Sequence, residues 1–263
     1  MSEPPAPLPP EPEQIAAEPP VAPEPTVPPQ PEPERYPFWT YHDLLLFAGL
    51  TIPCLFLGQG LVRLVFWALR VHPTLRAAEL LPEQLLGYGL LFWMLRLIFR
   101  MEYDRPFWAS LAWTKTRLPW LWIAMAGVVT AYTVAAASSL FQMPATSNPL
   151  MDLMKDRASL ILMAIFGVVM APVCEELIFR GFLQPLLVRS LGVAAGILVA
   201  AIPFGLLHYK EYGDSWRHAA LISLAGALFG WMRHATGSTM ASSIMHAAYN
   251  SLGFLALFMQ RKG

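Results

Sequence analysis

Residues 158–188 read ASLILMAIFGVVMAPVCEELIFRGFLQPLLV, and this stretch decides the fold class. Residues of low polarity run unbroken from Ser159 to Cys174, as expected of a helix in a membrane. As a straight helix the whole stretch would reach roughly 45 Å, whereas the hydrocarbon core of a bilayer is about 30 Å thick. We therefore expect this helix to tilt, bend or leave the membrane, with Pro172 and Pro185 as the bending points.

Apolar runs of similar length recur along the rest of the chain. Of its 263 residues, 56% are hydrophobic and 14% are charged, whereas soluble domains average about 45–50% apolar and about 25% charged. The sequence therefore predicts an all-α, polytopic transmembrane helix bundle of about seven spans in the cell (inner) membrane. The predicted helices cover residues 41–69, 83–101, 118–141, 158–188, 191–209, 217–234 and 238–260.

The N-terminal 37 residues differ in composition from everything that follows. They hold more than half of the 25 prolines, interleaved with Glu, Ala and Val. Such a segment lacks the backbone donors and the apolar surface needed to fold, so we expect a disordered Pro/Glu-rich tail. Over the whole chain, 18 Lys and Arg balance 18 Asp and Glu, which gives no reason to expect a nucleic-acid partner.

Two adjacent acids, Glu175 and Glu176, follow the apolar run directly, with Arg180 one helical turn later. Neighbouring residues on a helix diverge by about 100°, so the two carboxylates should point in different directions. Glu176 shares a face with Arg180 and can form an ion pair with it. Glu175 has no such partner along the helix, and an unpaired carboxylate in a low-dielectric site suits a general base acting on water. Alternatively, both acids only lock helices together through Arg180.

Two further pairs repeat the four-residue spacing. Phe204 and His208 share one face, where His208 could act chemically or be an interfacial residue bonded to backbone, and Phe204 could wall a site or simply pack. His246 and Asn250 share another face, and two donors one turn apart are what an oxyanion hole needs. Hydrogen bonding between helices is the alternative for this pair.

In order and spacing, these three pairs resemble the motifs of the CPBP (CAAX protease and bacteriocin-processing, or Abi) intramembrane proteases, which include the type II CAAX prenyl endopeptidases. Arg180-Gly181-Phe182-Leu183 after the first motif and Thr236-Gly237-Ser238 before the third are also similar to the family. The resemblance covers about residues 158–252. It divides the chain into a tail over 1–37, N-terminal transmembrane helices and interfacial segments over 38–157, and a catalytic membrane core over 158–260.

The resemblance implies an enzyme: a membrane-embedded peptidase of glutamic type. It implies that Glu175 activates water with His208, and that His246 and Asn250 hold the oxyanion. Glu176, Arg180 and Phe204 would support the site. It favours catalysis without a cofactor, and Arg180 would oppose a nearby cation. Zinc is the alternative, because two His and two Glu could ligate it.

The expected partners are a peptide or membrane-protein substrate and the lipid bilayer, while the oligomeric state stays open. The CAAX substrate itself does not follow from the motifs. Two other functions compete with the peptidase. One is a non-proteolytic membrane scaffold or immunity protein, and the other is a proton-coupled transporter that uses the same buried Glu and His groups. A transporter predicts two related halves with broken helices, and the sequence shows no such repeat.

Overall fold

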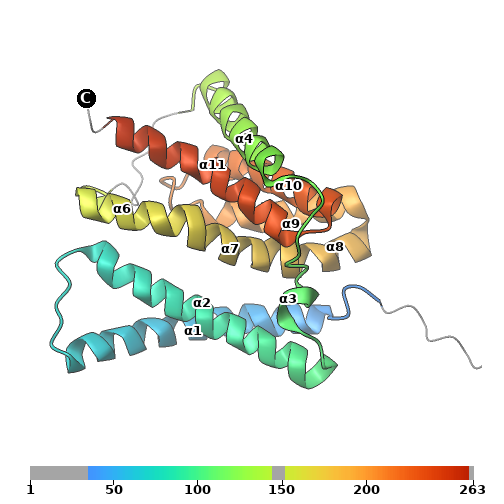
Figure 1. The fold of residues 1–263 in the computed structure, drawn as a ribbon, viewed down its shortest axis with the longest axis horizontal. Helices are drawn as coiled ribbons and strands as arrows, with labels where there is room; N and C mark the ends of the chain where they lie inside the picture. Colours follow the sequence, from blue (N-terminus) through green and yellow to red (C-terminus); the bar gives the residue numbers. More distant parts are fainter. Residues whose placement is uncertain (1–34, 144–151, 261–263) are drawn as a thin grey trace, which may run out of the picture. The chain divides into compact units, whose positions relative to one another are not determined.

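The computed structural model describes residues 35–143 and 152–260, and every regular element in these ranges is helical (Figure 1). The predicted disordered tail therefore lies almost wholly outside the described residues and stays a prediction. The elements are α1 (Tyr41–Ala68), α2 (Arg76–Tyr103), α3 (Phe107–Ser110), α4 (Trp120–Leu140), α6 (Arg157–Ile165), the π-helical η1 (Phe166–Met170), α7 (Ala171–Glu176), the π-helical η2 (Leu177–Leu183), α8 (Gln184–Leu191), α9 (Val193–Leu207), α10 (Trp216–Thr236) and α11 (Thr239–Gln260).

The helices agree with the predicted ranges to within a few residues, except that the second begins at Arg76 rather than near residue 83. Ion pairs between α1 and α2 explain the difference. Arg63 Nε in α1 lies 2.9 Å from Glu83 Oε1 and 3.8 Å from Glu79 Oε1 in α2. The charges of Glu79 and Glu83 are therefore paired with Arg63 of the neighbouring helix, so α2 can include both residues.

Three helical stretches are long and apolar enough to cross a membrane: Tyr41–Ala68, Trp120–Leu140 and Arg157–Leu191. Large apolar side chains are exposed on them, including Trp67 in α1 at 76% and Trp120 in α4 at 69%. Exposed apolar surface of this extent is expected where lipid covers a protein. These features indicate an integral membrane protein, whereas the predicted count of seven spans stays a prediction.

Residues 158–188 form one long helix that continues through two wider, π-helical turns instead of breaking. Each π-helical segment immediately precedes an α-helical segment whose second residue is proline, Pro172 after η1 and Pro185 after η2. Proline cannot donate to the preceding turn, and its ring collides with the carbonyl four residues earlier. A wider π turn moves that carbonyl away, and such π segments are frequent at functional sites. Here the two widened turns enclose α7, which carries both adjacent glutamates.

Trp39 packs the residues just before α1 against this long helix. Its ring is fully buried, stacks on Phe182 at 5.5 Å between centroids and lies 5.2 Å from Phe99 of α2. Its indole Nε1 also donates to the Phe182 carbonyl at 3.1 Å. The first two helices are therefore fixed to η2, directly beside the motif that begins at Glu175.

Glycines set the closest approaches between helices, which gives a test of the packing. In α4, a Cβ on Gly127 would collide with the Met245 carbonyl and the Ala248 side chain of α11, whereas a Cβ on Gly49 of α1 would meet no atom within 4 Å. We expect Gly127→Ala to lower the free energy of unfolding by about 1–3 kcal/mol through overpacking. Gly49→Ala should cause no loss, because alanine is the better helix former. Unfolding midpoints of both purified variants check this, and equal midpoints would contradict the packing of α4 on α11.

Candidate active site

Glu176 and Arg180 form the ion pair that their spacing predicts. Arg180 Nη1 lies 2.9 Å from Glu176 Oε1, and both side chains are at most 1% exposed. Arg180 Nη2 donates to the Gly226 carbonyl of α10 at 2.7 Å, and the guanidinium carbon lies 4.2 Å from the centre of the Phe204 ring. A buried guanidinium is thus compensated by a carboxylate, a carbonyl and an aromatic face. This pair joins α7 and η2 to α9 and α10.

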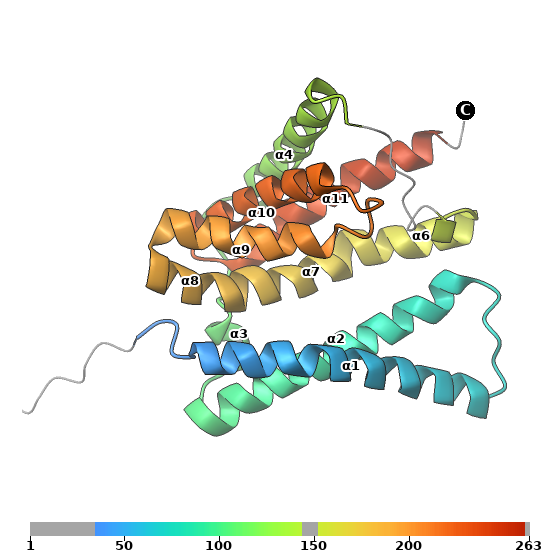
Figure 2. The ribbon, with the colours of Figure 1, turned by 180° about the vertical axis from the view of Figure 1, so that it is seen from behind.

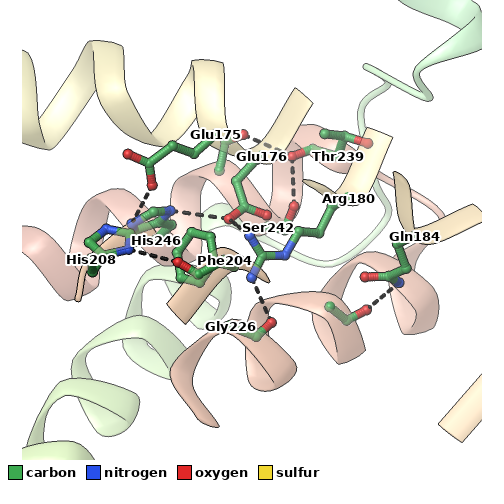
Figure 3. A network of polar contacts seen from close by, with 12 residues as sticks. Glu175, Glu176, Arg180, Gln184, Phe204, His208, Gly226, Thr239, Ser242 and His246 are labelled. Carbon is green, nitrogen blue, oxygen red and sulfur yellow. Dashed lines mark hydrogen bonds and ion pairs between the residues drawn. The ribbon is translucent and has the colours of Figure 1, made fainter. Parts of the chain in front are cut away.

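The two adjacent carboxylates converge on opposite nitrogens of one imidazole, His246 of α11 (Figure 3). Glu176 Oε1 lies 3.1 Å from His246 Nδ1, and Glu175 Oε2 lies 3.8 Å from His246 Nε2. The sequence correctly separated the directions of the two acids. It did not predict that a single ring from another helix would lie between them.

Glu175 has no partner along its own helix, as predicted, and its nearest basic neighbour is His246 rather than His208. A separation of 3.8 Å is too long for a direct hydrogen bond, so the Glu175 carboxylate and the His246 ring do not bond to each other directly. Glu175 Oε2 is a buried atom without a hydrogen-bond partner among the described residues, although the side chain as a whole is 19% exposed. This carboxylate therefore combines restricted access with unused bonding capacity.

His208 is fixed by the end of its own helix. Its Nδ1 lies 2.8 Å from the Phe204 carbonyl oxygen, which can only accept, so Nδ1 carries the hydrogen and Nε2 is left as an acceptor in the neutral ring. This bond gives the Phe204 carbonyl at the C-terminus of α9 a donor. The helix itself does not supply one, because the backbone N–H of His208 bonds to the Gly205 carbonyl instead. The side chain is only partly buried. A ring held in this tautomer can accept a proton from a neighbouring group.

Phe204 is buried and lies beside both histidines. Its ring centroid is 5.0 Å from that of His208 and 5.6 Å from that of His246, while its face receives Arg180 (Figure 3). Phe204 therefore packs between the Arg180 guanidinium and the two histidines, and its role in walling the site stays a prediction. It brings the second motif to the other two without placing His208 against Glu175.

Asn250 bonds to the backbone of η1. Its Nδ2 donates to the Gly167 carbonyl at 2.7 Å. In the π-helical register, Ala171 N bonds to Phe166 O, so the next donor would be the nitrogen of Pro172, which has no hydrogen. The Asn250 amide therefore replaces the missing backbone donor. Because Nδ2 has two hydrogens, one stays available for another acceptor.

Several residues around the cluster were missed in the sequence. The Phe229 ring stacks on His246 at 4.6 Å between centroids, and nothing in its spacing indicates this contact. Gln184 Nε2 donates to the Gly230 carbonyl at 2.9 Å and lies one turn after Arg180, so continued four-residue spacing could have identified it. Glu211, in the turn after α9, interacts electrostatically with both His208 and Glu175. The position of Glu211 depends on the turn and could not be read from a motif.

The described residues do not fit a zinc site. No group of three His, Cys, Asp or Glu side chains in the described ranges is arranged to hold a metal ion. Glu175 and Glu176 approach opposite sides of the His246 ring, and Arg180 already neutralises Glu176. We therefore derive no step through zinc.

The fold and the site define a helical membrane protein with a buried Glu–His–Arg cluster. Residues 157–252 match the family model described as type II CAAX prenyl endopeptidase Rce1-like. These residues carry a domain of the CPBP, or CAAX protease, family, as the three motifs predicted. The family indicates a protease that acts on a peptide substrate. No curated protein and no solved structure was found to match the chain.

Proposed function

We propose that the chain is an intramembrane endopeptidase in which Glu175 activates the attacking water. The observation that supports this most is the Glu175 carboxylate itself, buried at Oε2, without a hydrogen-bond partner there and 3.8 Å from His246 Nε2. The bundle around it would be polytopic, with seven spans formed by α1, α2, α4, the stretch from α6 to α8, α9, α10 and α11. Peptide bonds of peptides or membrane proteins would be the substrate.

In the proposed mechanism, Glu175 takes one proton from water as the hydroxide oxygen bonds to the peptide carbonyl carbon. His208 is the partner of this base, because its Nε2 can accept a hydrogen bond while Nδ1 stays on the Phe204 carbonyl. The carbon–nitrogen bond then breaks, and the proton held by Glu175 passes to the departing amine. Water is thereby consumed, and an acid and an amine are released.

The oxyanion of the tetrahedral intermediate would be held by His246 Nε2 and by the remaining amide hydrogen of Asn250. Since Nδ1 of His246 faces the Glu176 carboxylate, donation from Nε2 requires the doubly protonated ring, whose charge Glu176 balances. Arg180 in turn holds Glu176 in place. Glu176 and Arg180 are positioning residues in this scheme, and Phe204 excludes water from their ion pair.

The experiment that tests the proposal is cleavage of a quenched-fluorescent peptide library by the purified full-length protein in lipid nanodiscs. We expect cleavage at an internal peptide bond, identified by mass spectrometry of both products. A folded protein that cleaves no member of the library, and also no peptide anchored in the disc, would contradict the peptidase assignment.

The same assay separates metal-free hydrolysis from a zinc mechanism. No three His, Cys, Asp or Glu side chains among the described residues are arranged to hold a metal ion, and Glu176 is paired with Arg180. We therefore expect a chelator to leave the initial rate unchanged within error. Added zinc should not raise the rate. If the rate falls with chelator and returns with zinc, the proposal that Glu175 activates water without a metal ion is wrong.

A further inference from the structure

A cavity of about 680 Å³ lies outside the active-site cluster, where α1 begins and α8 ends. Both of the charged side chains that line it, Arg35 and Arg189, are cationic. Hydroxyl groups and aromatic rings form the rest of its wall. The lining residues are Arg35, Tyr36, Phe38, Thr40, Arg189 and Ser190, and we call the cavity the Arg35–Arg189 pocket.

Hydrogen bonds between the segment before α1 and the end of α8 hold the pocket walls in place. Arg189 Nη1 donates to the Pro37 carbonyl at 2.5 Å, and its Nη2 lies 3.4 Å from the Trp39 carbonyl. The Tyr41 hydroxyl donates to Ser190 Oγ at 2.7 Å. Arg35 makes no such bond to the wall in the described contacts, so its guanidinium is the group left to meet a ligand.

A third arginine lies directly behind the pocket wall. Arg233 of α10 is only 8% exposed, and its Nη2 donates to the Tyr36 hydroxyl at 3.0 Å while its Nε donates to Thr239 Oγ1 at 3.0 Å. Within residues 35–143 and 152–260 it forms no salt bridge with a carboxylate. Burial raises the pKa of Tyr36, with Arg233 opposing the rise, so the phenol is neutral at pH 7 and does not balance the Arg233 charge.

The balance of charge around the pocket is positive. The carboxylate tied most closely to its wall is Asp43, which accepts from the Thr40 backbone nitrogen at 2.7 Å. Among the described residues at the pocket wall, Arg35 and Arg189 line the pocket and Arg233 lies behind it. The pocket therefore favours an anion.

Its place in the fold indicates which anion. The candidate spans Tyr41–Ala68 and Arg157–Leu191 both end beside the pocket, at the same end of the two helices (Figures 1 and 2). The phosphates of a bilayer lie at this level, just beyond the apolar part of a span. Aromatic side chains such as Tyr36 and Phe38 are typical of the same layer, and arginine binds phosphate through paired hydrogen bonds.

We propose that the Arg35–Arg189 pocket binds the phosphate of an anionic phospholipid headgroup. The lipid would fix the segment before α1 to the end of α8, the helix that directly follows η2. This assignment does not depend on the peptidase activity, because it rests on charge, cavity and position at the ends of two candidate spans.

The test uses the full-length protein in nanodiscs of phosphatidylcholine with or without phosphatidylglycerol. We expect phosphatidylglycerol to raise the unfolding midpoint of the wild type, and native mass spectrometry to detect a retained phosphatidylglycerol molecule. Arg35→Gln should lose the shift and weaken retention roughly ten-fold, as expected for one charged hydrogen bond. The matched control is Arg76→Gln, which removes the same charge at the opposite end of the first hairpin, and it should keep both effects.

Three outcomes would overturn the proposal. Phosphatidylglycerol could fail to shift the wild-type midpoint, or it could shift wild type and Arg35→Gln equally, which would mean that the pocket is not the binding site. Inorganic phosphate or glycerol 3-phosphate, added to phosphatidylcholine discs, could produce the same shift as the lipid. That last result would assign the pocket to a soluble phosphate compound instead of a headgroup.

Discussion

Glu175→Gln is expected to lower the rate of peptide cleavage by about 10²–10⁴-fold, the usual contribution of a general base. Glutamine keeps the size of the side chain and its contacts around Oε2 but cannot take a proton from water. Because Glu175 makes no ion pair along its helix, the substitution should leave the unfolding midpoint nearly unchanged. The measurement is the initial rate on the peptide identified from the library, at saturating and at low substrate.

The matched control is Glu102→Gln, the same chemical change on an exposed residue near the end of α2. It should cleave at the wild-type rate. If Glu175→Gln also cleaves at that rate, Glu175 is not the base, and His208 becomes the next candidate. If the variant loses activity together with its unfolding midpoint, Glu175 is a structural residue, and the mechanism proposed above is wrong.

The helix boundaries followed from the lengths of apolar runs because a membrane helix must be apolar over its whole span. The predicted start of α2 was wrong by seven residues, because the charge of Glu83 in α2 is compensated by Arg63 of α1. That pairing depends on how α1 and α2 cross, which local sequence does not specify. The π-helical turns before Pro172 and Pro185 were also beyond prediction, and the predicted bends at these two prolines stay a prediction.

Within the site, spacing along one helix was informative and contacts between helices were not. The Glu176–Arg180 ion pair follows from four-residue periodicity. The position of His246 between the two glutamates depends on how α11 packs against α7, and the bond from Asn250 to Gly167 depends on a widened turn in a third segment. The oxyanion role of His246 and Asn250 stays a prediction.

The second large effect concerns stability. Arg180→Met should lower the free energy of unfolding by about 3–5 kcal/mol, because it leaves the fully buried Glu176 carboxylate without its countercharge. Methionine keeps much of the volume of the arginine stem, so the loss in free energy of unfolding comes mainly from the missing charge and less from a cavity. Unfolding midpoints in detergent measure it. Arg217→Met, an exposed arginine at the start of α10, serves as the control and should cause little change.

The double variant Glu176→Gln with Arg180→Met separates charge from packing. Since both members of the buried pair are then neutral, we expect it to regain most of the stability lost by Arg180→Met alone. Its cleavage rate should stay low, because His246 Nδ1 then faces a neutral amide in place of the carboxylate that balances the doubly protonated ring. Stability recovered together with wild-type cleavage would contradict the positioning role of the pair. A double variant no more stable than Arg180→Met would mean that the contact of Arg180 with Phe204 and Gly226, rather than its ion pair, holds η2 against α10.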